Sequence, residues 1–265
     1  MPEGPEVKIA SKYFNLFFND SKKIKFEIIT DYYYEKYNAV FKSINKNLKA
    51  FKPSYTIGKN IFIDLNNDSI FNFHLGMTGG WSSEKVKHCH FRVFNESQEL
   101  FFRDIRKFGK MRIISKSQLL KNHNPNFDLL HQEYNLTKHI NFLSAKIKPK
   151  KTICSILMNQ QYFPGVGNYI KSEALYAAKL HPEEKWLNIT KNKKLDLIKK
   201  TKEIMLQSYN SGGAELRDFK NPFNKSKFKL HIYGREYIED GLLVTSKLTS
   251  DNRKTWYSQE KQILM

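Results

Sequence analysis

The chain begins with residues that could form a covalent intermediate with a sugar. Its first six are Met1-Pro2-Glu3-Gly4-Pro5-Glu6. A small second residue such as Pro2 favours removal of Met1, and the secondary amine left behind titrates near ~7.7–8, so that it is partly neutral. A neutral amine can attack C1′ of a deoxyribose and form an iminium, and Glu3 is placed to exchange protons with the sugar or a water. The alternative is an ordinary helix start, where proline and glutamate are common.

Lys59 could supply a second reactive group. It lies in Ile57-Gly58-Lys59-Asn60, at the opening of a predicted strand. An ammonium at this place could protonate a leaving group or contact a phosphate. The alternative is a lysine that merely faces solvent, as most lysines do.

Two further stretches each end a strand in a glycine-containing turn, His74–Gly79 and Arg103–Gly109. Met77 and Phe108 are the kind of residue that fills the gap left by an extruded nucleotide. Arg106 could pair with the orphaned base. The alternatives are core packing for Met77 and Phe108 and a surface ion pair for Arg106.

The stretch Gly165-Val166-Gly167-Asn168 lies between two predicted helices. Glycines such as Gly167 allow backbone N–H groups to approach a phosphate at a helix N-terminus, and the alternative is a simple interhelical turn. Thr249–Tyr257 has the pattern of a hairpin whose basic tip could enter a groove, and the alternative is a solvated turn. His88 and His90 flank Cys89, but the period of a strand spreads the three over alternating faces, which argues against a metal site.

The hydrophobic pattern indicates the elements that must hold these groups. A helix should begin near Pro5, with Val7, Ala10, Phe14 and Phe17 on one face. Alternation from residue 20 to about 115 predicts an antiparallel sandwich or barrel, and helices follow from about 125, one of them capped by Thr190. Short strands, Lys227–Tyr233 and Thr255–Tyr257, should return at the end. The fold class is therefore α+β.

Charge and composition narrow the class of protein. Among 265 residues there are 45 Lys and Arg against 26 Asp and Glu, which gives a net charge of +19. A polyanionic partner fits this excess, although an AT-rich genome would also enrich lysine. The two cysteines, Cys89 and Cys154, indicate a reducing compartment and exclude a four-cysteine zinc site. With no signal peptide or apolar span, we expect a soluble intracellular protein, whether nuclear, cytoplasmic or in a viral factory.

In this order and spacing the motifs resemble the formamidopyrimidine-DNA glycosylase and endonuclease VIII family. The matching stretches run through nearly the whole chain: 1–6, 58–59, 74–79, 87–90, 103–109, 151–173, 177–182, 212–219 and 233–234. The resemblance implies a two-sheet β-sandwich with an N-terminal helix (1–125), a helix–two-turn–helix domain (126–222) and a finger (223–265).

The resemblance also implies roles for individual residues. Pro2 would be the Schiff-base nucleophile, Glu3 its acid–base partner, and Lys59 would act in glycosylic cleavage and β-elimination. The remaining residues would contact DNA: Met77, Arg106 and Phe108 in the void left by the flipped nucleotide, and His74, His88, Gly167 and Asn168 at the backbone.

The finger departs from the pattern of the family. Most members close it with four cysteines and zinc, and this chain has none of those cysteines. The sequence Arg253-Lys254-Thr255-Trp256-Tyr257 resembles the hairpin of the zincless, endonuclease VIII-like 1 branch. Arg253 would then contact phosphates and promote δ-elimination, and no cofactor is expected.

We therefore expect a monomeric DNA glycosylase and abasic-site lyase of base excision repair that acts on double-stranded DNA. Oxidised pyrimidines are the expected substrates, with oxidised purines as the alternative. The hypothesis from another class is a catalytically silent module that binds DNA damage. A nuclease or a ribosome-associated protein is a remote third.

Overall fold

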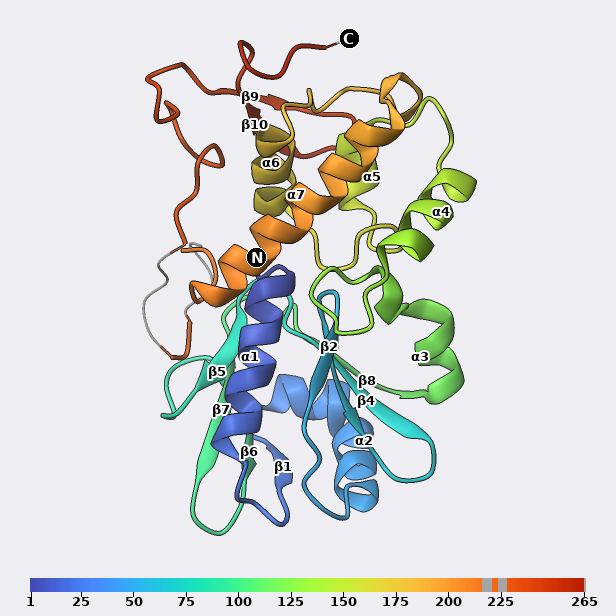
Figure 1. Cartoon of the computed structure of the whole chain (residues 1–265). Coiled ribbons are helices and arrows are strands. Elements are labelled where there is room, and N and C mark those ends of the chain that lie inside the picture. The colour runs from blue at the N-terminus through green and yellow to red at the C-terminus, as the bar shows by residue number, and fades with distance from the viewer. Residues whose placement is uncertain (216–220, 224–227, 265) are drawn as a thin grey trace. The chain divides into compact units, whose positions relative to one another are not determined.

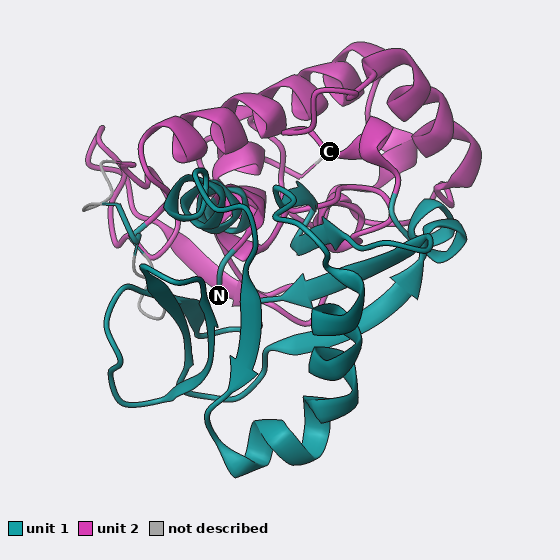
Figure 2. Cartoon of the chain, turned by 90° about the horizontal axis from the view of Figure 1, so that it is seen from below, with its two compact units in different colours: residues 1–2, 6–123, 215–226 teal, residues 3–5, 124–214, 227–265 magenta. Residues whose placement is uncertain are grey.

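The computed structural model describes residues 1–215, 221–223 and 228–264, and its elements are labelled in Figure 1. The chain divides into two compact units (Figure 2). Unit 1 contains residues 1–2, 6–123 and 215–226, and unit 2 contains residues 3–5, 124–214 and 227–265. The three-domain division with boundaries at residues 125 and 222 stays a prediction. Residues 216–219 of the motif at 212–219 lie outside the described residues.

Unit 1 contains two four-stranded sheets in which all neighbouring strands are antiparallel. The first has the order β1 (Lys25–Ile28), β6 (Cys89–Phe94), β7 (Glu99–Asp104), β5 (Gly79–Ser82). The second has the order β2 (Tyr55–Ile57), β3 (Asn60–Asp64), β4 (Ser69–His74), β8 (Lys110–Ser115).

Aromatic side chains from both sheets form the core of unit 1. The ring of Phe73 on β4 lies 4.8 Å from that of Phe102 on β7 and 5.8 Å from that of Phe91 on β6, centroid to centroid. All three rings are buried. Inward apolar residues at every second position are what a pair of packed sheets requires, so the predicted two-sheet sandwich is confirmed.

Three helices accompany these sheets: α1 (Gly4–Phe17), α2 (Asp31–Asn47) and α3 (Lys116–Asn122). The first is the predicted N-terminal helix, and Val7, Ala10 and Phe14 on it are buried. The second was not predicted, because the region was interpreted only as strands. Its buried residues, Tyr33, Tyr37, Phe41 and Ile44, nevertheless follow the helical period.

Unit 2 is mainly helical. Its elements are η1 (Pro125–Phe127), α4 (Leu136–Lys146), α5 (Ile153–Met158), α6 (Asn168–Ala177), η2 (Trp186–Asn188), α7 (Lys191–Asn210) and the antiparallel pair β9 (Thr245–Leu248) and β10 (Lys254–Tyr257). The Thr190 side chain accepts a hydrogen bond from the Lys193 amide, which confirms the predicted cap of α7.

The predicted strand Lys227–Tyr233 was wrong over its described part. Residues 228–233 form only an isolated bridge, between Phe228 and Ala214, and Lys227 lies outside the described residues. The buried carboxylate of Glu173 on α6 accepts hydrogen bonds from the amides of His231, Ile232 and Tyr233 at 2.8–2.9 Å. A side chain therefore satisfies the donors that a neighbouring strand would otherwise take.

Candidate active site

In unit 1 the loops that carry the predicted wedge residues are joined by one buried carboxylate. Asp104, at the end of β7, is 0% exposed. It accepts hydrogen bonds from the Thr78 hydroxyl at 2.5 Å and from the Gly109 amide at 2.7 Å. The Arg106 amide in turn donates to the Thr78 hydroxyl at 2.9 Å. Thr78 follows Met77 and Gly109 follows Phe108, so this network fixes both loops together.

Gly76 allows these two loops to approach each other. Its φ is +71°, and a Cβ atom at this position would lie 2.5 Å from the carbonyl carbon of Phe108. No real Cβ is found so close to backbone, and an L side chain rarely adopts this φ. The close approach of the two loops therefore requires glycine at position 76.

The wedge residues are available at the surface of unit 1. Phe108 is 47% exposed, Arg106 is exposed and Met77 is half-buried. The Arg106 guanidinium lies 4.9 Å from the centre of the Phe108 ring. Core packing, the alternative interpretation of Phe108, is excluded by this exposure.

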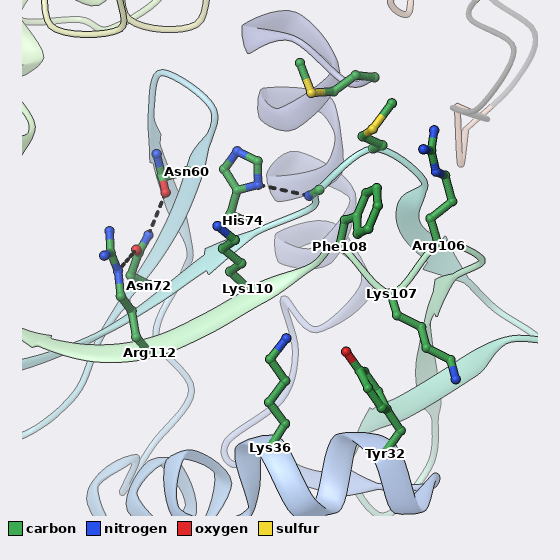
Figure 3. Close-up of a pocket in the computed structure, with 13 residues that line it drawn as sticks. Tyr32, Lys36, Asn60, Asn72, His74, Arg106, Lys107, Phe108, Lys110 and Arg112 are labelled. Carbon is green, nitrogen blue, oxygen red and sulfur yellow. Dashed lines mark hydrogen bonds between the residues drawn. The ribbon is translucent and has the colours of Figure 1, made fainter.

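These residues line a pocket of about 800 Å³ in unit 1, drawn in Figure 3. Tyr32 and Lys36 project toward it from α2, while His74 and Lys110 come from the adjacent strands β4 and β8. Its charged lining residues are all basic: Lys36, Arg106, Lys107, Lys110 and Arg112. Such a surface attracts phosphates.

His74 is a neutral hydrogen-bond donor in this pocket. Burial lowers its pKa to about 4, and the nearby charges of Lys59, Lys110 and Arg112 act in the same direction. Its Nδ1 accepts a hydrogen bond from the Gly76 amide at 3.0 Å, as the dashed line in Figure 3 marks. A neutral imidazole with Nδ1 as acceptor carries its proton on Nε2, so Nε2–H can donate to an anion.

In unit 2 the carboxylate of Glu3 lies against the N-terminus of α6. One oxygen accepts hydrogen bonds from the amides of Gly167 at 2.7 Å and Ile170 at 3.3 Å, and the other accepts from Tyr169 at 2.9 Å. Glu3 is 3% exposed. Three N–H donors and the positive helix end favour the charged carboxylate.

The close approach of Glu3 leaves room only for glycine at position 167. A Cβ atom there would lie 2.3 Å from the carboxyl carbon of Glu3. The amide that the sequence predicted to face a phosphate therefore binds a carboxylate of the same unit. A phosphate contact by Gly167 stays a prediction.

The other predicted site residues occupy different places. Pro2 is buried and Lys59 is 7% exposed, whereas Met1 is 37% exposed and lines the pocket of Figure 3. His88 precedes β6 with a φ of +71° and does not line that pocket.

The remaining two lie in unit 2, near the β9–β10 hairpin. Asn168 donates from Nδ2 to the carbonyl of Lys254 at 2.8 Å. Arg253, next to Lys254, is exposed in the hairpin turn. Asn168 and Arg253, each predicted to contact the DNA backbone, are therefore linked through Lys254 within unit 2.

Comparison with known proteins agrees with this arrangement. Residues 1–111 match the family model "Formamidopyrimidine-DNA glycosylase N-terminal domain", and residues 130–220 match "Formamidopyrimidine-DNA glycosylase H2TH domain". The chain belongs to the formamidopyrimidine-DNA glycosylase family. It is therefore a DNA glycosylase of base excision repair.

Individual relatives support this membership over most of the chain. The formamidopyrimidine-DNA glycosylase of Rickettsia conorii is 32% identical over 189 residues, which cover 67% of this chain and 68% of the relative. The Rickettsia bellii enzyme is 29% identical over 280 residues and 99% of both chains.

Solved structures share the fold. A structure of MutM in complex with DNA containing carbocyclic 8-oxo-G has a TM-score of 0.81 at 22% identity, covering 99% of this chain and 100% of that one. The Lactococcus lactis Fpg complex with abasic-site DNA has a TM-score of 0.81 at 23% identity, covering 98% and 99%.

Several residues of this glycosylase's site were not identified from its sequence. Asp104 lies inside a recognised motif but was not singled out, because its role depends on a hydrogen bond to Thr78. Tyr32 and Lys36 belong to the helix that was not predicted. Among the described residues no group of three or more His, Cys, Asp or Glu side chains is arranged to hold a metal, and no described helix is long and apolar enough to span a membrane.

Proposed function

We propose that this glycosylase excises an oxidised base and then cuts the strand, with the amine of Pro2 as its nucleophile. The observation that carries the proposal is the buried Glu3 carboxylate, held by the amides of Gly167, Tyr169 and Ile170 directly after Pro2 in the chain. Removal of Met1 is part of the mechanism, because an acylated proline nitrogen cannot attack.

The chemistry begins with a bond from the Pro2 nitrogen to C1′ of the damaged nucleotide. The bond from C1′ to the base breaks, its electron pair leaves with the base, and the base takes up a proton. Glu3 takes up the proton that the Pro2 nitrogen loses and passes it to O4′ as the C1′–O4′ bond breaks. The sugar is then open and joined to Pro2 through an iminium at C1′. Lys59 assists the departure of the base.

Strand cleavage follows from the iminium. Loss of a proton from C2′ expels the 3′ phosphate in β-elimination, a step in which Lys59 also acts. Loss of the C4′ proton then expels the 5′ phosphate in δ-elimination, which Arg253 promotes by contacting the phosphate. Water finally hydrolyses the iminium and frees Pro2.

DNA binding is assigned to the residues predicted from the sequence. Met77, Arg106 and Phe108 fill the space of the extruded nucleotide, and their exposure supports this. His74, His88 and Asn168 contact the backbone, while the amide of Gly167 is held by Glu3.

His74→Ala should weaken binding to abasic-site DNA without changing its salt dependence. The neutral imidazole displaces no counterion, so the loss is one hydrogen bond to a charged group, about tenfold in affinity. Lys110→Ala, the matched control in the same pocket, should reduce the slope of log K against log salt by about 0.9. Titrations at several salt concentrations and at pH 5.5 and 8 measure both, and the His74 contribution should be equal at the two pH values because its pKa is about 4. If His74→Ala reduced the salt slope as much as Lys110→Ala does, the imidazole would be charged when it meets the phosphate.

Two classes of lesion are candidates. Oxidised pyrimidines are predicted from the likeness of the finger to the zincless branch. Ring-opened purines are supported by the name of the relatives, formamidopyrimidine-DNA glycosylase. The solved Lactococcus lactis complexes include both Fapy-dG and oxidised-pyrimidine DNA.

Cleavage of defined duplexes tests the proposed function. Duplexes with an oxidised pyrimidine, Fapy-dG or an abasic site should be cut to products that carry phosphates at both ends of the gap, and undamaged DNA should not be cut. Strand cleavage by the Arg253→Ala variant should stop mainly at the product of β-elimination. Binding of all three duplexes with no cleavage would support the silent damage-binding module instead.

A further inference from the structure

The finger hairpin of this glycosylase is unsuited to the metal that the family pattern implies. The two cysteines of the chain lie outside the hairpin, Cys89 on β6 and Cys154 on α5, and both are buried. In the turn between β9 and β10, Asp251 is the single carboxylate and its oxygens already have partners. These residues do not fit a zinc site, so other contacts must hold the hairpin.

A buried ion pair links the hairpin turn to α6. Lys171 Nζ lies 2.6 Å from Asp251 Oδ2, and the two side chains are 0% and 4% exposed. The second oxygen of Asp251 accepts from the Thr249 hydroxyl at 2.5 Å. By contrast, the ion pairs of Arg92, Lys193, Lys200, Lys229, His231 and Lys261 have side chains that are at least 30% exposed. A charged pair taken out of water is costly unless its geometry is well matched.

A second contact lies one helical turn away on the same face of α6. Asn168 Nδ2 donates to the Lys254 carbonyl at 2.8 Å. Asn168 and Lys171 are three residues apart, so both point toward the hairpin. They hold the chain at residues 254 and 251, and Arg253 lies between these two points.

The turn itself is closed by hydrogen bonds between its own backbone groups. The Thr249 amide donates to the Arg253 carbonyl at 3.0 Å, and the Asn252 amide donates to the Thr249 carbonyl at 2.8 Å. Asn252 has a φ of +57°. The Ser250 amide also donates to Glu183 at 2.7 Å. The backbone on both sides of Arg253 is therefore specified.

We propose that Lys171 and Asp251 are positioning residues which hold the turn in place of a metal, so that the Arg253 side chain meets the phosphate. The proposal rests on the proposed role of Arg253 in δ-elimination. Removal of the Lys171 charge leaves Asp251 buried without a cation, and the turn must open to hydrate it.

The test compares Lys171→Met with Lys171→Arg and with Lys229→Met, in the full chain with EDTA present. Lys229 is the matched control, since it forms an ion pair with Glu239 that is exposed on both sides. On abasic-site duplex, Lys171→Met should reduce the ratio of δ- to β-product at least about tenfold. Its borohydride-trapped adduct should remain as in the parent protein, because Pro2 is untouched. Lys171→Arg and Lys229→Met should keep the parent ratio.

Hydrogen exchange separates this proposal from the role of Arg253. The amides of Thr249 and Asn252 should exchange at least about tenfold faster in Lys171→Met and not in Lys229→Met. If Arg253→Ala keeps the parent product ratio, the proposed role of Arg253 is wrong. The positioning role of Lys171 and Asp251 is then decided by hydrogen exchange alone. Parent exchange rates in Lys171→Met would overturn the positioning role of Lys171 and Asp251. So would a parent product ratio in Lys171→Met when Arg253→Ala lowers that ratio. If Lys171→Met does not fold, Asp251→Asn decides by the same readouts.

Discussion

Replacing Glu3 by Gln is expected to reduce base excision by about 10²–10⁴-fold, the contribution typical of a positioned acid–base group. The carboxylate is nearly inaccessible and is presented by the amides of Gly167, Tyr169 and Ile170. An amide of the same shape cannot accept or return a proton. Single-turnover excision from a lesion duplex measures the loss.

A preformed abasic site provides the internal control for Glu3→Gln. Its base is already absent and its sugar opens to the aldehyde without help from the enzyme, so covalent trapping by Pro2 should largely persist. Glu3→Ala should also lower the free energy of unfolding by about 1–3 kcal/mol, because buried amides of α6 lose their acceptor. Excision at the parent rate by a folded Glu3→Gln protein would reduce Glu3 to a helix cap.

Replacing Asp104 by Ala is expected to lower the free energy of unfolding by at least about 3 kcal/mol, because each buried donor left without an acceptor costs about 1–3 kcal/mol. The Thr78 hydroxyl, the Gly109 amide and the Tyr33 hydroxyl all donate to this carboxylate. Urea unfolding measures the change. The same substitution should free the two wedge loops from each other.

Asp104→Asn is the matched variant, since its amide oxygen can still accept one of these hydrogen bonds. It should be less destabilised and retain more excision. A fluorescent base beside the lesion reports nucleotide flipping at temperatures where both variants are folded. Flipping as in the parent protein by folded Asp104→Ala would show that the wedge loops need no common anchor.

Local patterns predicted much of the fold because they record which face of an element is buried. Apolar residues at alternate positions, such as Ile61 and Ile63, were sufficient to predict β3. The capping residue Thr190 was sufficient to predict the start of α7. The helix α2 was missed although Tyr33 and Tyr37 follow its period. The strand predicted at 227–233 was wrong over residues 228–233, because Glu173, far away in sequence, binds the amides of residues 231–233.

The candidate site was predicted unevenly for a similar reason. Motifs single out candidate side chains such as Lys59 and Phe108, since residue type and spacing are local properties. They do not reveal which group a buried carboxylate meets. Glu3 binds the amide of Gly167, 164 positions away in sequence, and Lys171 binds Asp251, 80 positions away. Such contacts need the fold before they can be seen.

The most direct test of the account is to locate the covalent adduct. Protein freed of Met1 is incubated with abasic-site duplex and borohydride, digested with protease, and analysed by mass spectrometry. The account predicts a reduced sugar adduct on the N-terminal peptide, at the Pro2 nitrogen, and no adduct from protein that retains Met1. An adduct on a lysine peptide instead, or none from the Met1-free protein, would contradict it.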